Sequence, residues 1–199
     1  MSDRLKVTGL ILAGGRGSRM HGLDKGLQLH DGTALALHVL RRLAPQVGLV
    51  AINANRNAED YAAMGVPIVP DTLPDSPGPL AGFLAGLEQC TTDLLVTVPC
   101  DVPMLPIDLV GRLQTALDAE GADLAMAATR EVGDVRLQPT FCLMRIGVKA
   151  SLRSFLADGG RKVSAWTTTL PNAVVVFDDL AAFANVNTLA DLQALPRLA

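Results

Sequence analysis

The stretch VTGLILAGG, residues 7–15, decides the fold of this chain. Its first six residues are an apolar run of strand length, and the two glycines at its end break that run. Apolar runs of this kind alternate with amphipathic segments of helix length along all 199 residues. Such alternation is typical of βαβ units, so the sequence predicts an α/β fold with a mostly parallel sheet flanked by helices.

The same periodicity places the other elements along the chain. We expect strands at residues 7–12, 47–52, 66–69, 94–98, 124–128, 139–144 and 173–177. We expect helices at residues 34–43, 58–64, 108–117, 148–156 and 189–195, and a further helix that begins with Pro79. Thr188 and Asp191 have the spacing of a capping box for the last helix. The segments 70–79 and 129–138 are expected to be irregular loops.

Length and composition indicate one globular domain over residues 1–199. Hydrophobic residues make up 49% of the chain and charged residues 19%, which excludes a disordered or collagen-like chain. The net charge is −3 and aromatic residues account for 4%. The chain therefore has neither a general basic field nor much stacking surface, and we expect no nucleic-acid partner.

Several sequence features favour a cytoplasmic protein. The apolar runs, such as 94–98 and 173–177, are far shorter than the ~20 residues that a membrane helix needs, so we expect no membrane contact. The charged N-terminus has no cleavage signature. The odd number of cysteines, three, argues against a disulfide framework. His21, His30 and His38 lack the spacing of a zinc site and are expected to be ordinary surface or loop residues.

Ligands of open α/β sheets bind beyond the carboxyl ends of the strands, so the residues that follow each strand are the candidates. A glycine-rich loop with several cations, including Arg19 and Lys25, follows the first strand. It does not match the Walker pattern, because Lys25 precedes a glycine, nor the dinucleotide fingerprint, because Met20 stands where a glycine is needed. The loop is either a phosphate site built from backbone N–H groups and cations or a flexible turn with solvated charges.

Asp101 follows the buried run 94–98 and lies between two prolines. A carboxylate at the end of a central strand, opposite a cationic loop, is suited to hold Mg²⁺ together with phosphate oxygens. Cys100 beside it favours packing over nucleophilic chemistry, since no base is near it in the sequence.

Other strand ends carry amides and a further carboxylate. The segment Asn53-Ala54-Asn55-Arg56 either reads the edge of a base or simply begins a helix. Asp71 is either a binding residue or a loop cap. Asn185 and Asn187 point the same way if their segment is extended, where they either hold a polar ligand or cap the last helix. Arg161 and Lys162 are either an anion contact or solvated charge.

The whole set of segments resembles the molybdenum cofactor guanylyltransferase family. The loop Leu12-Ala13-Gly14-Gly15 resembles the signature of nucleotidyltransferases, which is weakly specific alone. The combination, over residues 8–195, is strongly specific. The resemblance implies a single-domain, three-layer, Rossmann-like fold of the nucleotide-diphospho-sugar transferase type. The further matching segments, in order, are 53–56, Asp71, 77–82, 99–101, 139–140 and 185–188.

The resemblance also implies an activity, the transfer of GMP from GTP to the terminal phosphate of the molybdenum cofactor, Mo-molybdopterin, with release of pyrophosphate. Asp101 would hold Mg²⁺, and Asp101, Lys25 and Arg19 would be the catalytic residues. Asn185 and Asn187 would lie on the pterin side, so that the N-terminal half binds GTP and the C-terminal half binds pterin. The residues expected to bind GTP are Leu12, Ala13, Gly14, Gly15, Lys25, Asn53, Asp71 and Asp101.

The family resemblance implies as protein partners the apo-molybdoenzymes or their chaperones and the upstream molybdopterin proteins. Some relatives carry a histidine where this chain has Gln138, which leaves the role of that position open. Two alternatives remain at this stage. One is a related transferase that uses CTP or a sugar-phosphate acceptor, and the other is a nucleotide-binding module without chemistry.

Overall fold

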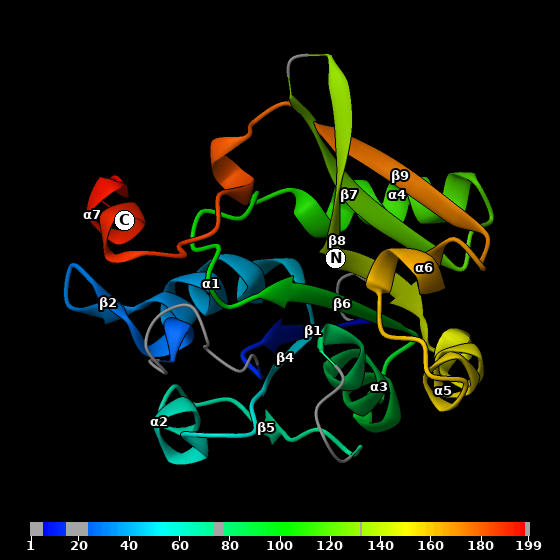
Figure 1. Ribbon diagram of the computed structural model, residues 1–199, viewed down its shortest axis with the longest axis horizontal. Helices are drawn as coiled ribbons and strands as arrows, with labels where there is room; N and C mark the ends of the chain where they lie inside the picture. Colours follow the sequence, from blue (N-terminus) through cyan, green and yellow to red (C-terminus); the bar gives the residue numbers. More distant parts are fainter. Residues whose placement is uncertain (1–5, 15–23, 74–77, 132, 198–199) are drawn as a thin grey trace.

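A central sheet of seven strands organises the computed structural model, which describes residues 6–14, 24–73, 78–131 and 133–197 (Figure 1). The strand order is β5-β4-β1-β6-β8-β7-β9. The pairs β5–β4, β4–β1, β1–β6 and β7–β9 are parallel, and β8 runs antiparallel to both of its neighbours. The strands are β1 (Val7–Leu12), β4 (Leu49–Asn53), β5 (Ile68–Val69), β6 (Leu94–Pro99), β7 (Leu124–Glu131), β8 (Asp134–Arg145) and β9 (Asn172–Phe177).

Helices cover both faces of the sheet and complete three layers. They are α1 (Leu35–Leu43), α2 (Ala58–Ala62), α3 (Pro79–Gln89), α4 (Leu109–Ala119), α5 (Lys149–Ala157), α6 (Val163–Thr167) and α7 (Leu189–Ala194). A short hairpin of β2 (Leu29–His30) and β3 (Thr33–Ala34) precedes α1, after the 3₁₀ turn η2 (Lys25–Leu27). The predicted α/β fold with a mostly parallel sheet is confirmed.

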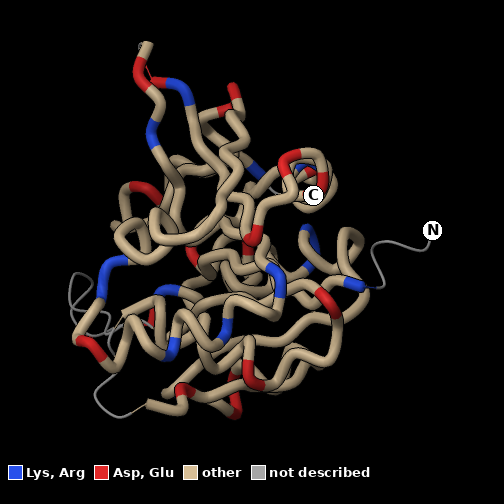
Figure 2. The backbone as a smooth tube through the Cα atoms, turned by 90° about the vertical axis from the view of Figure 1, so that its right-hand side faces the viewer, with Lys and Arg blue, Asp and Glu red and all other residues tan. Residues whose placement is uncertain are grey.

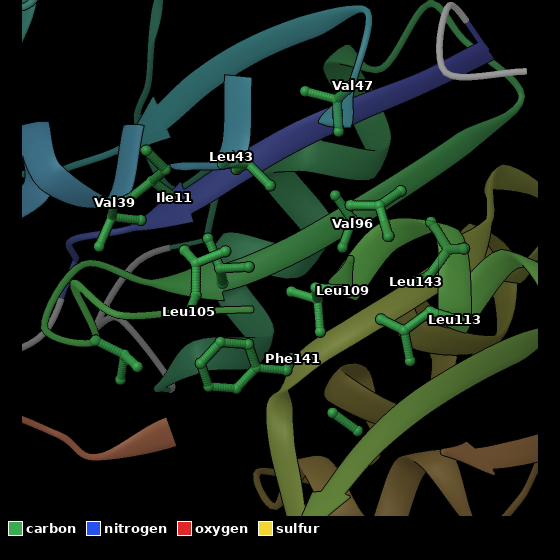
Figure 3. Close-up of a cluster of buried hydrophobic side chains, with 14 of the residues drawn as sticks. Ile11, Val39, Leu43, Val47, Val96, Leu105, Leu109, Leu113, Phe141 and Leu143 are labelled. Carbon is green, nitrogen blue, oxygen red and sulfur yellow. The ribbon is translucent and has the colours of Figure 1, made fainter. Parts of the chain in front are cut away.

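The two faces of the sheet form two hydrophobic cores. Successive side chains of a strand point to opposite faces, so Ile11 of β1 belongs to the core that includes α1 and α4, and Leu10 belongs to the core that includes α3, α5 and α6. Figure 3 shows part of the first core, which includes Leu43 of α1, Leu109 of α4 and Val96 of β6. All six residues of β6 are buried, as expected for a strand covered on both faces. This burial makes β6 a rigid support for the residues that follow it.

The segment 129–138 is not the irregular loop that the sequence predicted. Strands β7 and β8 continue through it and form a long antiparallel hairpin that projects at the top of Figure 1. Its register shifts at a bulge between Met126 and Ala127. The prediction was wrong because the outer hairpin carries exposed charged residues such as Arg130 and Arg136 in place of an apolar run, and cross-strand pairing stabilises it.

Two histidines also differ from expectation. His30 and His38 are buried, whereas the sequence favoured ordinary surface or loop positions. His30 Nε2 donates to the carbonyl oxygen of Pro196 at 2.9 Å, and His38 Nε2 donates to that of His30 at 3.2 Å. A buried polar ring costs little when its nitrogen keeps a hydrogen bond, so these contacts explain the burial. His21 lies outside the described residues.

Charges of both signs are interspersed along the backbone seen in Figure 2, including the projecting hairpin. Within the described part of the chain, no helix combines the length and the apolar character needed to cross a membrane.

Candidate active site

Three parallel strands end together at the edge of the sheet where we expected the ligand. Leu12 at the end of β1 pairs with Asn53 of β4 on one side and with Pro99 of β6 on the other. Beyond the strands, the backbone N–H of Ala13 donates to the carbonyl oxygen of Asn53 at 2.8 Å, and that of Cys100 donates to Leu12 at 3.1 Å. The residues after all three strands are therefore held side by side.

One group of polar side chains, which we call the Asp101 cluster, consists of Lys25, Asp101, Asn185 and Asn187. The ammonium of Lys25 lies 3.1 Å from Oδ2 of Asp101 and donates to Oδ1 of Asn187 at 2.6 Å. The amide of Asn185 donates to the other carboxylate oxygen of Asp101 at 3.1 Å. The cluster thus joins η2, the end of β6 and the segment before α7.

Backbone contacts hold the C-terminal part of the Asp101 cluster in place. The N–H of Val186 donates to the carbonyl oxygen of Asp101 at 2.9 Å. The predicted capping box is confirmed, since Thr188 accepts from the N–H of Asp191 and the Asp191 carboxylate accepts from that of Thr188. The Asp191 carboxylate also accepts from the N–H of Asn187 at 2.9 Å, and these hydrogen bonds lower the pKa of Asp191. The side chains of Asn185 and Asn187 are therefore presented by a well-anchored segment.

The Asp101 cluster combines a cation and an anion at a partly buried position. The side chain of Asp101 is 11% exposed and that of Lys25 is 22% exposed. Exclusion of water strengthens the electrostatic effect of both groups. An ammonium at this position can bind anionic oxygens, and the carboxylate can bind a cation.

A second group, the Asp71 cluster, consists of Asn53, Asn55 and Asp71. One oxygen of Asp71 accepts from the amide of Asn53 at 2.9 Å, and the other accepts from the amide of Asn55 at 2.7 Å. The N–H of Asp71 donates back to Oδ1 of Asn55 at 2.8 Å. These contacts orient the carboxylate with neutral donors.

Gly14 lies directly against the Asp71 cluster. A Cβ atom at Gly14 would stand 3.1 Å from Oδ1 of Asn53 and 3.1 Å from Nδ2 of Asn55. A larger residue would therefore displace the two amides, so the glycine permits close approach of the backbone after β1.

The structure brings most of the predicted site residues to one edge of the sheet. Leu12, Ala13, Gly14, Asn53 and Asp71 gather on the side of β4 and β5, and the Asp101 cluster lies beyond β6. Gly15 and Arg19 lie outside the described residues.

Two other predicted positions have structural partners. Arg161 donates to the carbonyl oxygens of Leu156 and Gly160, so its guanidinium contacts the end of α5. Gln138 donates to Oγ1 of Thr129 across the β7–β8 hairpin at 3.1 Å.

Sequence reasoning missed the residues that hold the turn from which Lys25 extends. Asp24 accepts hydrogen bonds from the Tyr61 hydroxyl, the Asn57 amide and the N–H of Gly26. An aspartate directly before a short helical turn is a typical N-cap, a signal that could have identified Asp24. No local signal marks Tyr61, because the contact spans 37 positions. Cys100 beside them is buried, and this burial raises the pKa of its thiol, in agreement with a packing role.

Comparisons with known proteins agree with this geometry. The family model for the MobA-like NTP transferase domain matches residues 9–172. A protein from Bordetella petrii called molybdenum cofactor guanylyltransferase is 58% identical over 196 residues, which cover 98% of this chain and 100% of that protein. A protein of the same name from Ralstonia nicotianae is 56% identical over 194 residues, 95% of each chain.

Solved structures show the same fold at lower identity. Molybdopterin-guanine dinucleotide biosynthesis protein A from Archaeoglobus fulgidus has a TM-score of 0.74 at 21% identity, with 94% of this chain and 95% of that chain covered. A 4-diphosphocytidyl-2C-methyl-D-erythritol synthase from Anaerococcus prevotii has a TM-score of 0.77 at 14% identity, with 96% and 94% covered. The family model covers most of the chain and the relatives match it over nearly its whole length, so the chain belongs to the MobA-like NTP transferase family.

Proposed function

We propose that this protein is a nucleotidyltransferase that transfers GMP from GTP to the terminal phosphate of Mo-molybdopterin. The products are the molybdopterin guanine dinucleotide cofactor and pyrophosphate. Relatives at 56–58% identity carry the name of this activity. The observation that carries the proposal is the Lys25–Asp101 pair at the same edge of the sheet as the Asp71 cluster, because it offers a cation for phosphates and a carboxylate with amide neighbours for a base.

The nucleotide would lie across the ends of β1 and β4. Backbone groups of residues 12–14 would meet the nucleoside, and the Asp71 cluster would face the base. A carboxylate has about four acceptor sites, so Asp71 keeps capacity beyond the two amides that it already accepts. Guanine offers a ring N–H and an exocyclic amine on one edge, which such an acceptor can bind together. Cytosine offers only an exocyclic amine on the corresponding edge.

Lys25 would contact the phosphates of GTP. An ammonium has three N–H donors, and that of Lys25 donates to Asp101 and Asn187, so a further N–H serves a phosphate oxygen. The predicted cation Arg19 would add charge at the same loop.

A magnesium ion fits the donor set at the end of β6. Within the described residues, no group of three or more His, Cys, Asp or Glu side chains forms a complete metal site. Mg²⁺ does not need one, because it usually takes one or two carboxylates and completes its coordination with substrate phosphates and water. Asp101 would supply the carboxylate, and the ion would neutralise charge on the phosphates and the leaving pyrophosphate.

The chemistry that remains for the protein is positioning and charge stabilisation. The terminal phosphate of the pterin attacks the α-phosphorus of GTP, forms a new O–P bond, and the bond to the bridging oxygen breaks with its electron pair on pyrophosphate. A phosphate with a second pKa near ~6 is largely ionised at neutral pH, so no general base has to remove a proton. In-line alignment and the Lys25 cation would lower the barrier.

The acceptor would enter from the side of the C-terminal segment. Asn185 and Asn187 are anchored there by Val186 and α7, and they offer amide groups to a pterin. The N-terminal half would thus bind GTP and the C-terminal half the pterin, with Lys25 and Asp101 where the halves meet.

Cellular context follows from this chemistry. GTP is supplied in the cytoplasm, so the reaction would take place there. The upstream molybdopterin proteins would deliver the acceptor, and an apo-molybdoenzyme or its chaperone would receive the oxygen-sensitive product.

The test is an anaerobic assay of pyrophosphate release by the purified protein with Mg²⁺. GTP together with Mo-molybdopterin should release pyrophosphate and yield the guanine dinucleotide cofactor. Parallel reactions replace GTP by CTP, or the pterin by a sugar phosphate. Release that requires CTP or a sugar phosphate would contradict the proposal, and so would GTP binding without any product.

A further inference from the structure

Asp24 lies at the centre of a hydrogen-bond network directly behind Lys25. Oδ1 of Asp24 accepts from the Tyr61 hydroxyl and, at 3.2 Å, from the N–H of Gly26. Oδ2 accepts from the amide of Asn57 at 3.0 Å. Asp24 is also the N-cap of η2, the turn that begins with Lys25. The backbone from which the Lys25 side chain extends is therefore tied to α2 through one carboxylate.

Tyr61 is a rigid reference point for this network. Its side chain belongs to the core that packs on α1 and α4, and the residue is 0% exposed. Burial raises the pKa of the Tyr61 phenol, and the nearby Cys100 and Asp24 raise it further. The hydroxyl therefore keeps its proton and always acts as a donor toward Asp24.

Gly26 brings the network into contact with the residues that precede Asp101. A Cβ atom at Gly26 would overlap the Tyr61 hydroxyl and would stand 3.2 Å from the Sγ of Cys100. The turn η2 thus packs between Tyr61 and the end of β6. Lys25, which precedes Gly26, and Asp101, which follows Cys100, are therefore both held next to this contact.

We propose that Asp24, held by Tyr61 and Asn57, is a positioning residue that directs the Lys25 ammonium toward Asp101 and the nucleotide phosphates. The proposal rests on the proposed function in taking Lys25 as a phosphate ligand. A lysine side chain has several rotatable bonds and loses much rotamer freedom when it is held. When Asp24 fixes the backbone of Lys25 before the nucleotide binds, less conformational entropy of this residue is lost on nucleotide binding.

A single segment, residues 53–61, supplies donors to both carboxylates near the site. Asn53 and Asn55 donate to Asp71, and Asn57 and Tyr61 donate to Asp24. The network at Asp24 therefore affects the phosphate side, and the cluster at Asp71 affects the base side. Loss of the Tyr61 hydroxyl should weaken the binding of GTP without changing the preference for guanine.

The experiment measures GTP affinity by calorimetry in Mg²⁺ for the full chain, with each variant made alone and together with Lys25→Ala. Tyr61→Phe, which deletes one hydrogen bond, should weaken binding about fivefold. Asp24→Ala, which deletes three, should weaken it more than about tenfold. In the Lys25→Ala background both effects should fall below about twofold, because the group being positioned is gone.

Two controls separate positioning from charge and from general stability. Asp24→Asn keeps one side-chain oxygen that accepts from Tyr61 and Gly26. Its new N–H group faces Asn57, whose exposed amide can rotate and present its oxygen as the acceptor. Binding within about twofold of wild type is expected for it, since the hydrogen bonds are restored. Thr167→Val deletes another buried hydroxyl, on α6, and should leave GTP affinity unchanged.

The outcomes distinguish this inference from the proposed function. If Lys25→Ala binds GTP as tightly as wild type, the phosphate contact and the inference both fail. If Lys25→Ala weakens binding but Tyr61→Phe and Asp24→Ala do not, the inference alone fails. Equal weakening in both backgrounds would also overturn it, since that result indicates a general structural effect. If Asp24→Ala does not fold, the GTP affinity of Tyr61→Phe in the two backgrounds tests the inference by itself.

Discussion

The two polar clusters at the edge of the sheet differ in how they are built and in charge. The Asp71 cluster draws on residues 53–71, which neighbouring strands bring together. The Asp101 cluster joins residues as far apart as 25 and 187. Asp71 accepts from neutral amides, whereas Asp101 accepts from an ammonium and an amide.

On the proposed function, this difference would separate two tasks at one site. A carboxylate oriented by amides keeps acceptor sites and, on the proposed function, would accept hydrogen bonds from a base. A carboxylate beside an ammonium is suited to the charges of phosphates and metal ions. The Asp101 cluster also depends on the C-terminal segment, so it is assembled only when residues 185–187 have folded against η2 and the end of β6.

The largest effect is expected for Asp101→Ala. It removes the proposed magnesium ligand and leaves the Lys25 ammonium without its carboxylate partner, so turnover should fall by at least ~10²–10³. Pyrophosphate release measures turnover, and the far-ultraviolet circular dichroism spectrum should show an intact fold. Full activity at saturating Mg²⁺ would falsify the metal role.

Asp71→Ala should instead affect the choice of nucleotide. Loss of a bidentate acceptor for guanine should reduce the preference of kcat/KM for GTP over ATP by about tenfold or more, by analogy with base readout elsewhere. Measurement with both nucleotides at fixed pterin concentration tests this. An unchanged preference would show that Asp71 does not recognise the base, so the two clusters would not differ in function as proposed.

Asn187→Ala tests the division between the nucleotide and pterin sides. It removes one acceptor of Lys25 and an amide that faces the proposed pterin side, so the KM for Mo-molybdopterin should rise about fivefold. The dissociation constant of GTP should rise by a smaller factor, because Lys25 keeps Asp101 as a partner. The opposite pattern would assign Asn187 to the nucleotide.

The smallest effect concerns stability at high pH. Burial raises the pKa of the Cys100 thiol above its ordinary value of 9.0, and it raises the pKa of Cys142 to about 12. Above pH 9 the unfolded thiols ionise while the folded ones stay protonated, so their contribution to the free energy of unfolding is constant below that pH and falls as pH rises above it. Each thiol contributes a slope of about 1.4 kcal/mol per pH unit.

Cys100→Ala isolates the thiol that lies beside the Asp101 cluster. Urea unfolding between pH 8 and 11 should show a loss of stability that is less steep than in wild type by one thiol's slope, while Cys142 and the buried Tyr61 phenol still contribute. An unchanged slope would indicate that the Cys100 thiol ionises in the folded protein, which would reopen a chemical role for it.

Some of this structure could be predicted because its signals are local. The runs at residues 7–12 and 94–98 are continuously apolar, so their strands were identified and they are confirmed as β1 and β6. The rule that ligands bind beyond parallel strands then led to Asn53 and Asp101, and both lie at that edge of the sheet. The Thr188 capping box was found for the same reason, since its partners are three residues apart.

Other features have no local signal. The hairpin at 129–138 has no continuous apolar run, and its strands are specified by pairing with each other. His30 is buried with a hydrogen bond to the carbonyl oxygen of Pro196, 166 positions away, and His38 is buried with one to the carbonyl oxygen of His30. Sequence reasoning also missed Asp24 and Tyr61, whose contact crosses 37 positions.

The sequence by itself determined the α/β class, the strands of the sheet and the strand ends that carry polar side chains, because periodicity and strand-end chemistry depend on neighbouring residues. Only the tertiary structure decided which of those side chains meet. It placed Lys25 between Asp101 and Asn187 and placed Tyr61 behind Asp24. The physical reason is that hydrogen bonds and ion pairs act over about 3 Å in space, whatever the separation of the residues along the chain.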